Sequence, residues 1–138
     1  MRILAIDHGT KRMGIAIGDE LAMIAQPLEF IPAEPFAALL DRLKEIIRSK
    51  QVELIVVGMP RNMNGSYGPA ASKVQEFVAV LKDAVTIPIQ TLDERLTSVQ
   101  AHRLLTDAEV RGRQRKEKVD KSAAAVLLQS YLDGRTAH

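Results

Sequence analysis

Residues 3–18, ILAIDHGTKRMGIAIG, contain the pattern from which the rest of the architecture can be inferred. An apolar run ends at a single carboxylate, Asp7, and a second alternating run begins at Met13 after a short turn. Two such runs joined by a tight turn containing Gly9 predict a pair of antiparallel β-strands. Because a strand ends where its hydrophobic pattern ends, Asp7 is expected at the rim of the sheet. A charged side chain is rarely buried there without a partner or a metal ion.

The remaining segments alternate between strand and helix patterns. Pro27 interrupts the third strand, which indicates an edge position or a bulge. We expect a strand over 21–31, a helix from about 35, a strand over 54–57, a turn over 58–68, a helix from about 69, a strand over 87–92, a helix opening at the capping pair of residues 97 and 100, and a last helix over 119–132. Gly112 and its basic neighbours are expected to break the helix before the last one. This order predicts an α/β fold, in which a mixed five-stranded sheet (three antiparallel strands, then βα units) is flanked by helices.

Composition restricts the class of protein. The 138 residues are 46% hydrophobic and 26% charged, as in an ordinary globular protein, and we expect one domain over 1–138. There is no cysteine, which excludes disulfides and thiolate metal sites. No segment approaches the roughly 20 apolar residues of a membrane span. The N-terminal residues lack a signal-peptide pattern, so we expect a soluble cytoplasmic protein with no membrane partner.

Three carboxylates stand where chemistry is possible. Asp7 closes the first strand, and its alternative role is to cap its own turn. Glu94 follows the strand over 87–92; it is either a solvated acid near a helix N-terminus or a neighbour of Asp7, because parallel strands end at the same edge of a sheet. Asp120 begins the last helix on its inward face, by its spacing from Ala123, Ala124 and Leu127, although an N-cap role is equally consistent.

Three carboxylates from separate elements would suit Mg²⁺ or Mn²⁺, which are hard ions that keep positions open for substrate phosphates. Two such ions about 3.5–4 Å apart would favour in-line displacement at a phosphodiester. Other chemistries have little support, since no Walker A or GxGxxG motif is present and the three histidines lack a metal-binding spacing. We interpret His8, His102 and His138 as ordinary surface or turn residues.

Four motifs in the same order resemble the YqgF family, also called RuvX, of Holliday junction resolvase-like proteins. They are DHGTKRMGIA (7–16), VGMPRNMNGS (57–66), DERLTS (93–98) and VDKSAA (119–124). The resemblance covers nearly the whole chain. It implies an RNase H-like fold, similar to that of the RuvC resolvases, and a nuclease acting in maturation of the small-subunit ribosomal RNA precursor.

By the same resemblance, Asp7, Glu94 and Asp120 are the catalytic, metal-binding acids. Two positions depart from the family pattern or from that of RuvC resolvases. Asn64 stands where an aspartate is frequent, which changes the charge of the loop but removes no catalytic acid. RuvC-type resolvases have an acid after the fourth strand, where this chain has Gly58, so the second acid comes from after the fifth strand.

Two segments are candidates for binding nucleic acid. The turn over 61–68 offers Arg61 and Asn62 and leads into a helix N-terminus, which favours a phosphate, although a plain polar loop is the alternative. Residues 111–121 contain six basic and two acidic residues, which indicates a segment that binds the phosphate backbone. A solvated mobile loop is the alternative interpretation. The candidate nucleic-acid-binding residues are Lys11, Arg12, Arg61, Asn62, Arg111, Arg113, Arg115 and Lys116. The basic stretch is expected to be poorly ordered in the free protein.

Competing functions remain open at this point. A Holliday junction resolvase acting on branched DNA would need two active sites and hence a homodimer, whereas trimming an RNA end would need only a monomer. A non-catalytic module that binds ribosomal RNA or the transcription machinery is also consistent with the sequence. A kinase or ATPase of the actin and hexokinase type shares the Asp-x-Gly-Thr turn, but it would need a second similar domain.

Overall fold

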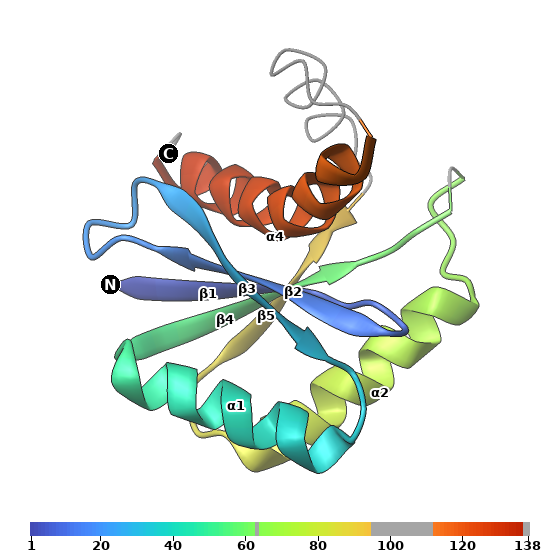
Figure 1. Cartoon of the computed structure of the whole chain (residues 1–138), viewed down its shortest axis with the longest axis horizontal. Coiled ribbons are helices and arrows are strands. Elements are labelled where there is room, and N and C mark those ends of the chain that lie inside the picture. Colours follow the sequence, from blue (N-terminus) through green and yellow to red (C-terminus); the bar gives the residue numbers. More distant parts are fainter. Residues whose placement is uncertain (63, 95–111, 137–138) are drawn as a thin grey trace.

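A computed structural model describes the backbone of residues 1–62, 64–94 and 112–136, with side chains for all of these except 112–122 and 136. Five strands form one sheet in the order β3-β2-β1-β4-β5 (Figure 1). The elements are β1 Arg2–Asp7, β2 Arg12–Gly18, β3 Ala25–Pro32, α1 Phe36–Ser49, β4 Val52–Met59, α2 Pro69–Ala84, β5 Ile89–Asp93 and α4 Gly112–Thr136. The pairs β1–β2 and β2–β3 are antiparallel, whereas β1–β4 and β4–β5 are parallel. The predicted mixed sheet is therefore confirmed, and β1, β4 and β5 end at the same edge.

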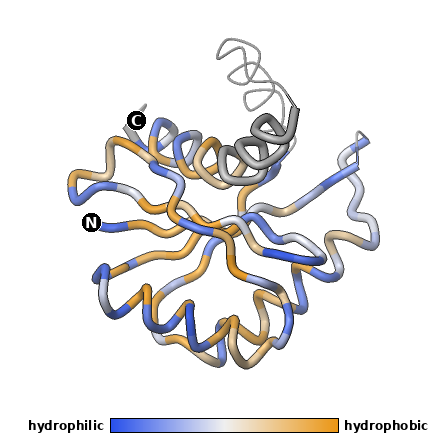
Figure 2. Tube along the Cα trace, in the orientation of Figure 1, coloured by the Kyte–Doolittle hydropathy of each residue, from blue (hydrophilic) through white to orange (hydrophobic). Residues whose placement is uncertain are grey.

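The sheet is covered on both faces, by α1 and α2 on one side and by α4 on the other (Figure 1). Leu4 and Ile6 of β1 pack with the core that α1 and α2 complete, and Ile3 and Ala5 pack with the core that α4 completes. All four side chains are fully buried. This explains why β1 is a continuous apolar run, which Figure 2 shows for the centre of the sheet. Each buried large aliphatic side chain contributes about 1.5–3 kcal/mol to folding.

The third strand begins at Ala25, later than the expected position 21, because a tight turn comes before it. The Asp19 carboxylate accepts hydrogen bonds from the backbone N–H groups of Met23 and Ile24, at 2.7 and 2.9 Å. This turn leaves Leu21 76% exposed. The expectation for Pro27 is confirmed, since β3 is an edge strand and its pairing with β2 shifts register beside Pro27.

Gln129 of α4 joins the helix to this turn. Its side-chain oxygen accepts a hydrogen bond from the backbone N–H of Ala25, and its amide nitrogen donates to the Met23 carbonyl, both at 2.9 Å. The same nitrogen donates to the Asp133 carboxylate at 3.0 Å. The helix is thus attached to the edge of the sheet by polar contacts as well as by apolar packing.

The last helix was expected over 119–132 and begins earlier, at Gly112. The basic residues from 113 to 118 lie within α4, so the expected start of this helix at residue 119 is wrong. Poor order of this stretch in the free protein stays a prediction. The helix expected to open at residue 97 lies outside the described residues. No helix in the described part of the chain has an apolar stretch that could cross a membrane.

Candidate active site

Asp7 and Glu94 meet at the edge where the parallel strands end. Asp7 is the last residue of β1, and Glu94 directly follows β5. Strand β4 lies between these two strands in the sheet. The two side chains are nevertheless joined by a hydrogen bond, which requires that one of the carboxyl groups carries a proton. The structure therefore brings together two of the three acids that the sequence singled out.

Gly58 allows Glu94 to reach Asp7. It pairs with Leu92 near the end of β4, between the two acids. A Cβ atom at residue 58 would lie 2.8 Å from both Cγ and Cδ of Glu94. The Glu94 side chain therefore crosses the end of β4 through space that only a glycine leaves free.

The Glu94 carboxyl group is strongly perturbed. Burial, followed by the hydrogen bond to Asp7 and the negative charges of Asp7 and Asp93, raises the pKa of Glu94 to about 8. Each cause disfavours the carboxylate form, since a buried charge loses solvation and a neighbouring like charge repels it. These causes favour the protonated form of the carboxyl group in the metal-free protein.

A divalent cation could replace that proton. Two carboxylates in a partly buried site supply the oxygen ligands that Mg²⁺ and Mn²⁺ prefer, and a cation would remove the repulsion between them. Among the side chains that the structure describes, no group of three His, Asp or Glu residues is placed to hold a metal ion. The donor set fits an ion that keeps several water ligands.

Asp120 lies in α4, four residues before Ala124 and seven before Leu127. Both of these alanine and leucine side chains are buried against the sheet. Helical spacing puts residue 120 on the same face of α4 as these two residues. The Asp120 side chain itself is outside the described set, so its role as a third ligand stays a prediction.

Lys11 and Arg12 lie beside Asp7. Together with Asp7 and Phe30 they line a hollow of about 450 Å³. The Arg12 guanidinium lies 4.2 Å from the centre of the Phe30 ring, an arrangement typical of a cation–π contact. Two cationic side chains next to the acid pair are suitably placed for a backbone phosphate.

Arg61 is held by its own loop. It donates hydrogen bonds to the Gly65 carbonyl, lies 4.7 Å above the Tyr67 ring and pairs with the Asp93 carboxylate at 3.6 Å. Sequence reasoning proposed Arg61 as a phosphate ligand and did not anticipate these partners. Because Asp93 directly precedes Glu94, the Arg61 pair fastens the loop beside the acid pair.

Asn62 also stabilises this loop from within. Its backbone N–H donates to the Ser66 carbonyl at 2.8 Å, and its side-chain amide donates to the Ser66 hydroxyl at 3.0 Å. The Asn64 carboxamide oxygen accepts from the Ser66 backbone and hydroxyl, at 3.0 and 2.6 Å. The polar side chains that were proposed to bind nucleic acid thus also define the shape of the loop.

Most of the basic stretch over 111–118 lies at the start of α4. Residues 113, 115 and 116 lie in the first turns of this helix, and their side chains are outside the described set. Arg111 lies outside the described residues altogether. A role for Arg113, Arg115 and Lys116 in binding phosphates stays a prediction. These residues would present their side chains from a helix.

Sequence reasoning missed the surroundings of His8. This residue lies in the turn after β1, as expected, but it is half-buried and its ring centre lies 5.2 Å from that of Phe77 in α2. Burial lowers the pKa of His8, and the charge of Asp7 opposes this shift. No local pattern could have revealed a contact between residues so far apart in the chain.

The sheet order, the helices on both faces and the paired acids at the carboxyl edge define a class, the RNase H-like α/β proteins. The fold is similar to that of RuvC from Thermus thermophilus, with a TM-score of 0.60 at 13% identity over 99% of this chain and 97% of that one. It is also similar to the Fowlpox virus resolvase solved with Holliday junction DNA, with a TM-score of 0.59 at 11% identity over 98% and 99% of the two chains.

Within this class, the chain belongs to the RuvX family, described as Holliday junction resolvase, whose pattern matches residues 1–134. A relative from Moorella thermoacetica is 47% identical over 133 residues, which cover 96% of this chain and 95% of the relative. One from Roseiflexus is 42% identical over 134 residues, covering 97% and 95% of the two chains. Both relatives bear the name "Putative pre-16S rRNA nuclease". The family resemblance of the four motifs is therefore confirmed.

Proposed function

We propose that this chain is a metal-dependent endonuclease that hydrolyses phosphodiester bonds in structured nucleic acid. The observation that carries this proposal is the hydrogen-bonded pair of Asp7 and Glu94 at the carboxyl edge of an RNase H-like sheet. Two acids that repel each other in the absence of a cation cost folding free energy, which a binding site for a cation explains.

Asp7, Glu94 and Asp120 would hold Mg²⁺ or Mn²⁺. When bound, such an ion supplies Lewis-acid polarisation of a phosphoryl oxygen and lowers the pKa of a water ligand. The chain itself does the positioning. Lys11 and Arg12 bind the backbone phosphate next to Asp7, and Arg61 keeps the loop over 60–68 in place beside Glu94. Asn62 maintains the shape of that loop.

The substrate that we favour is the precursor of the small-subunit ribosomal RNA. This choice is supported by the names of the relatives that are 42% and 47% identical to this chain. Such a precursor would be met in the bacterial cytoplasm. The second candidate is branched DNA, which is supported by the family description and by the fold of the junction resolvases. Cutting a four-way junction symmetrically would need a homodimer, whereas cutting RNA would not.

The test is a cleavage assay on two substrates, a precursor rRNA fragment and a four-way DNA junction, with Mg²⁺ or Mn²⁺ and with EDTA. We expect wild type to cut the RNA only with the metal, and Asp7→Asn to lose this activity. The matched control is Asp41→Asn, which changes an exposed aspartate on α1. Cutting of the junction alone would favour the second candidate. Tight binding without cleavage of either substrate would contradict an enzyme and favour a binding module.

A further inference from the structure

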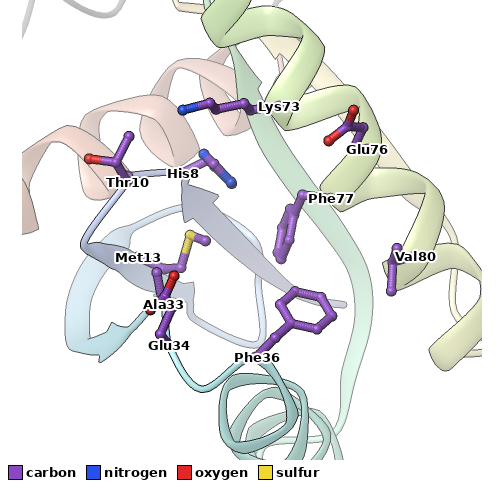
Figure 3. Close-up of a pocket in the computed structure, with 11 residues that line it drawn as sticks. His8, Thr10, Met13, Ala33, Glu34, Phe36, Lys73, Glu76, Phe77 and Val80 are labelled. Atoms are coloured by element: carbon purple, nitrogen blue, oxygen red, sulfur yellow. The ribbon is translucent and has the colours of Figure 1, made fainter.

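A second hollow lies on the face of the sheet that α1 and α2 cover and has no part in the proposed chemistry. It measures about 470 Å³, which is within the range of roughly 300–1,000 Å³ typical of small-molecule sites. His8 from the end of β1, Phe36 from α1 and Phe77 from α2 face the same space, as Figure 3 shows. Asp7 and His8 are consecutive at the end of β1, so their side chains lie on opposite faces of the sheet. Gly9 and Thr10 line both this pocket and the hollow beside Asp7, so the two hollows meet at the turn after β1.

Aromatic rings form the inner part of the pocket. Phe77 lies between the other two rings, with its centre 5.2 Å from His8 at an interplanar angle of 58° and 6.4 Å from Phe36 at 87°. Phe77 is almost fully buried, so its position is fixed by the core, whereas Phe36 remains 38% exposed. An apolar wall with one accessible ring offers a planar ligand a surface for stacking.

Charged side chains stand at the rim. Lys73 extends from α2 above His8, and Glu76 follows from the same helix (Figure 3). Glu34 lines the opposite side, in the connection before α1. A lysine can pair with a phosphate, and a carboxylate can accept hydrogen bonds from the amino group of a base. The pocket thus combines an apolar aromatic floor with groups suited to both parts of a nucleotide.

We propose that this pocket binds one unpaired nucleobase of the strand that is cut, across the turn after β1 from the phosphate held at the acid pair. The proposal rests on the proposed nuclease function and adds a requirement to it. A base in a duplex is stacked and paired, so it must be splayed out to lie against Phe36 and Phe77. The protein would therefore favour sites where single-stranded nucleotides adjoin the scissile bond.

The test uses the full chain with Asp7→Asn, so that binding is measured without cleavage. The probes are oligoribonucleotides with a duplex and an unpaired tail, each carrying 2-aminopurine at one position across the boundary. We expect the fluorescence to fall on binding at one unpaired position. Adding Phe36→Ala should restore it and weaken binding about fivefold or more, since stacking is worth about 1–3 kcal/mol per base.

Two further variants keep the result interpretable. Leu21→Ala changes an exposed apolar side chain in the turn before β3 and should leave the signal unchanged. Phe77→Leu keeps apolar volume in the core but removes the central ring, so it should weaken the signal while thermal unfolding shows a folded protein. The proposal would be overturned if the fluorescence change did not depend on the position of 2-aminopurine. Equal effects of Phe36→Ala and Leu21→Ala would also overturn it. Both results are independent of whether wild type cleaves RNA, so failure of the pocket is distinguishable from failure of the nuclease proposal.

Discussion

Gly58 leaves free the space that the Glu94 side chain occupies: a Cβ atom on residue 58 would overlap Oε1 of Glu94. A side chain at residue 58 and the observed position of Glu94 therefore exclude each other. A glycine at the end of β4 is therefore a condition for the observed position of the acid that follows β5.

Replacing Gly58 by alanine should displace Glu94 and disrupt its hydrogen bond to Asp7. We expect cleavage to fall about 100-fold, as is typical when a catalytic group moves by about 1 Å. Circular dichroism should show an intact fold. Gly134→Ala is the matched control, because a Cβ atom there meets nothing within 4 Å. Equal activity of the two variants would contradict a role for Glu94.

Asp7→Asn should lower the pKa of Glu94 and raise the melting temperature of the metal-free protein. The hydrogen bond and charge of Asp7 both contribute to the raised pKa, but burial is the largest cause, so the pKa should fall only in part. Carbon-13 NMR titration of the Glu94 carboxyl group measures this directly. An unchanged titration midpoint would mean that the two side chains do not interact in solution.

The metal-free protein should lose stability as the pH rises from about 5 to 8. In this range folded Glu94, with a pKa of about 8, keeps a proton that the unfolded chain releases near its ordinary pKa of 4.5. The folded state then binds more protons, so the free energy of unfolding falls with pH, by at most about 1.4 kcal/mol per pH unit.

Denaturant titrations in EDTA at several pH values measure this slope. Glu94→Gln should flatten it, since the amide does not titrate. Added Mg²⁺ should also reduce the loss of stability, because an ion takes the place of the proton. Parallel curves for wild type and Glu94→Gln would show that the burial of Glu94 is absent in solution.

Arg61→Lys should loosen the loop over 60–68 with little change in global stability. Lysine keeps a charge near Asp93, but it lacks the planar group that bonds to the Gly65 carbonyl and lies over Tyr67. Hydrogen exchange of the loop amides should become faster, and the loss of stability should stay below about 1 kcal/mol because the ion pair is partly exposed. Arg42→Lys on α1, which disturbs the pairs with Glu29 and Glu45, is the control and should leave loop exchange unchanged.

Neutralising four basic residues, Arg111, Arg113, Arg115 and Lys116, should weaken nucleic-acid binding and flatten its salt dependence. Each lost phosphate contact removes about 0.9 from the slope of log K against log salt on duplex DNA. Sequence preference should stay the same, because phosphate contacts position the protein without reading bases. The control neutralises four basic residues elsewhere in the chain, Lys44, Arg48, Lys50 and Lys82. An equal effect of both sets would mean that only net charge matters.

The meeting of Asp7 and Glu94 could be predicted because it depends on topology. Once the strands that carry these acids are parallel neighbours of β4, their carboxyl ends must share an edge. The start of β3 could not be predicted in this way. The apolar residues after Asp19 have a strand-like composition, and only the hydrogen bonds of the Asp19 carboxylate turn them into an exposed loop.

The roles of Arg61 and His8 were harder to foresee for a related reason. Arg61 has a cation's charge, which suggests a phosphate, but its partners are a carbonyl four residues on and the carboxylate of Asp93. His8 contacts Phe77, which belongs to a different element. Side-chain partners distant in sequence are set by tertiary packing, and no local periodicity records them.

The contacts of Gln129 have a mechanical consequence for the acid at residue 120. They anchor α4 at the turn before β3, and Asp120 stands nine residues earlier in the same helix, about 14 Å along its axis. Because the rise per residue of an α-helix is constant, a shift of the helix along its axis at Gln129 moves residue 120 by the same distance. A shift of one turn would move residue 120 by about 5.4 Å. The position of residue 120, the predicted third ligand, therefore depends on hydrogen bonds made at the turn before β3.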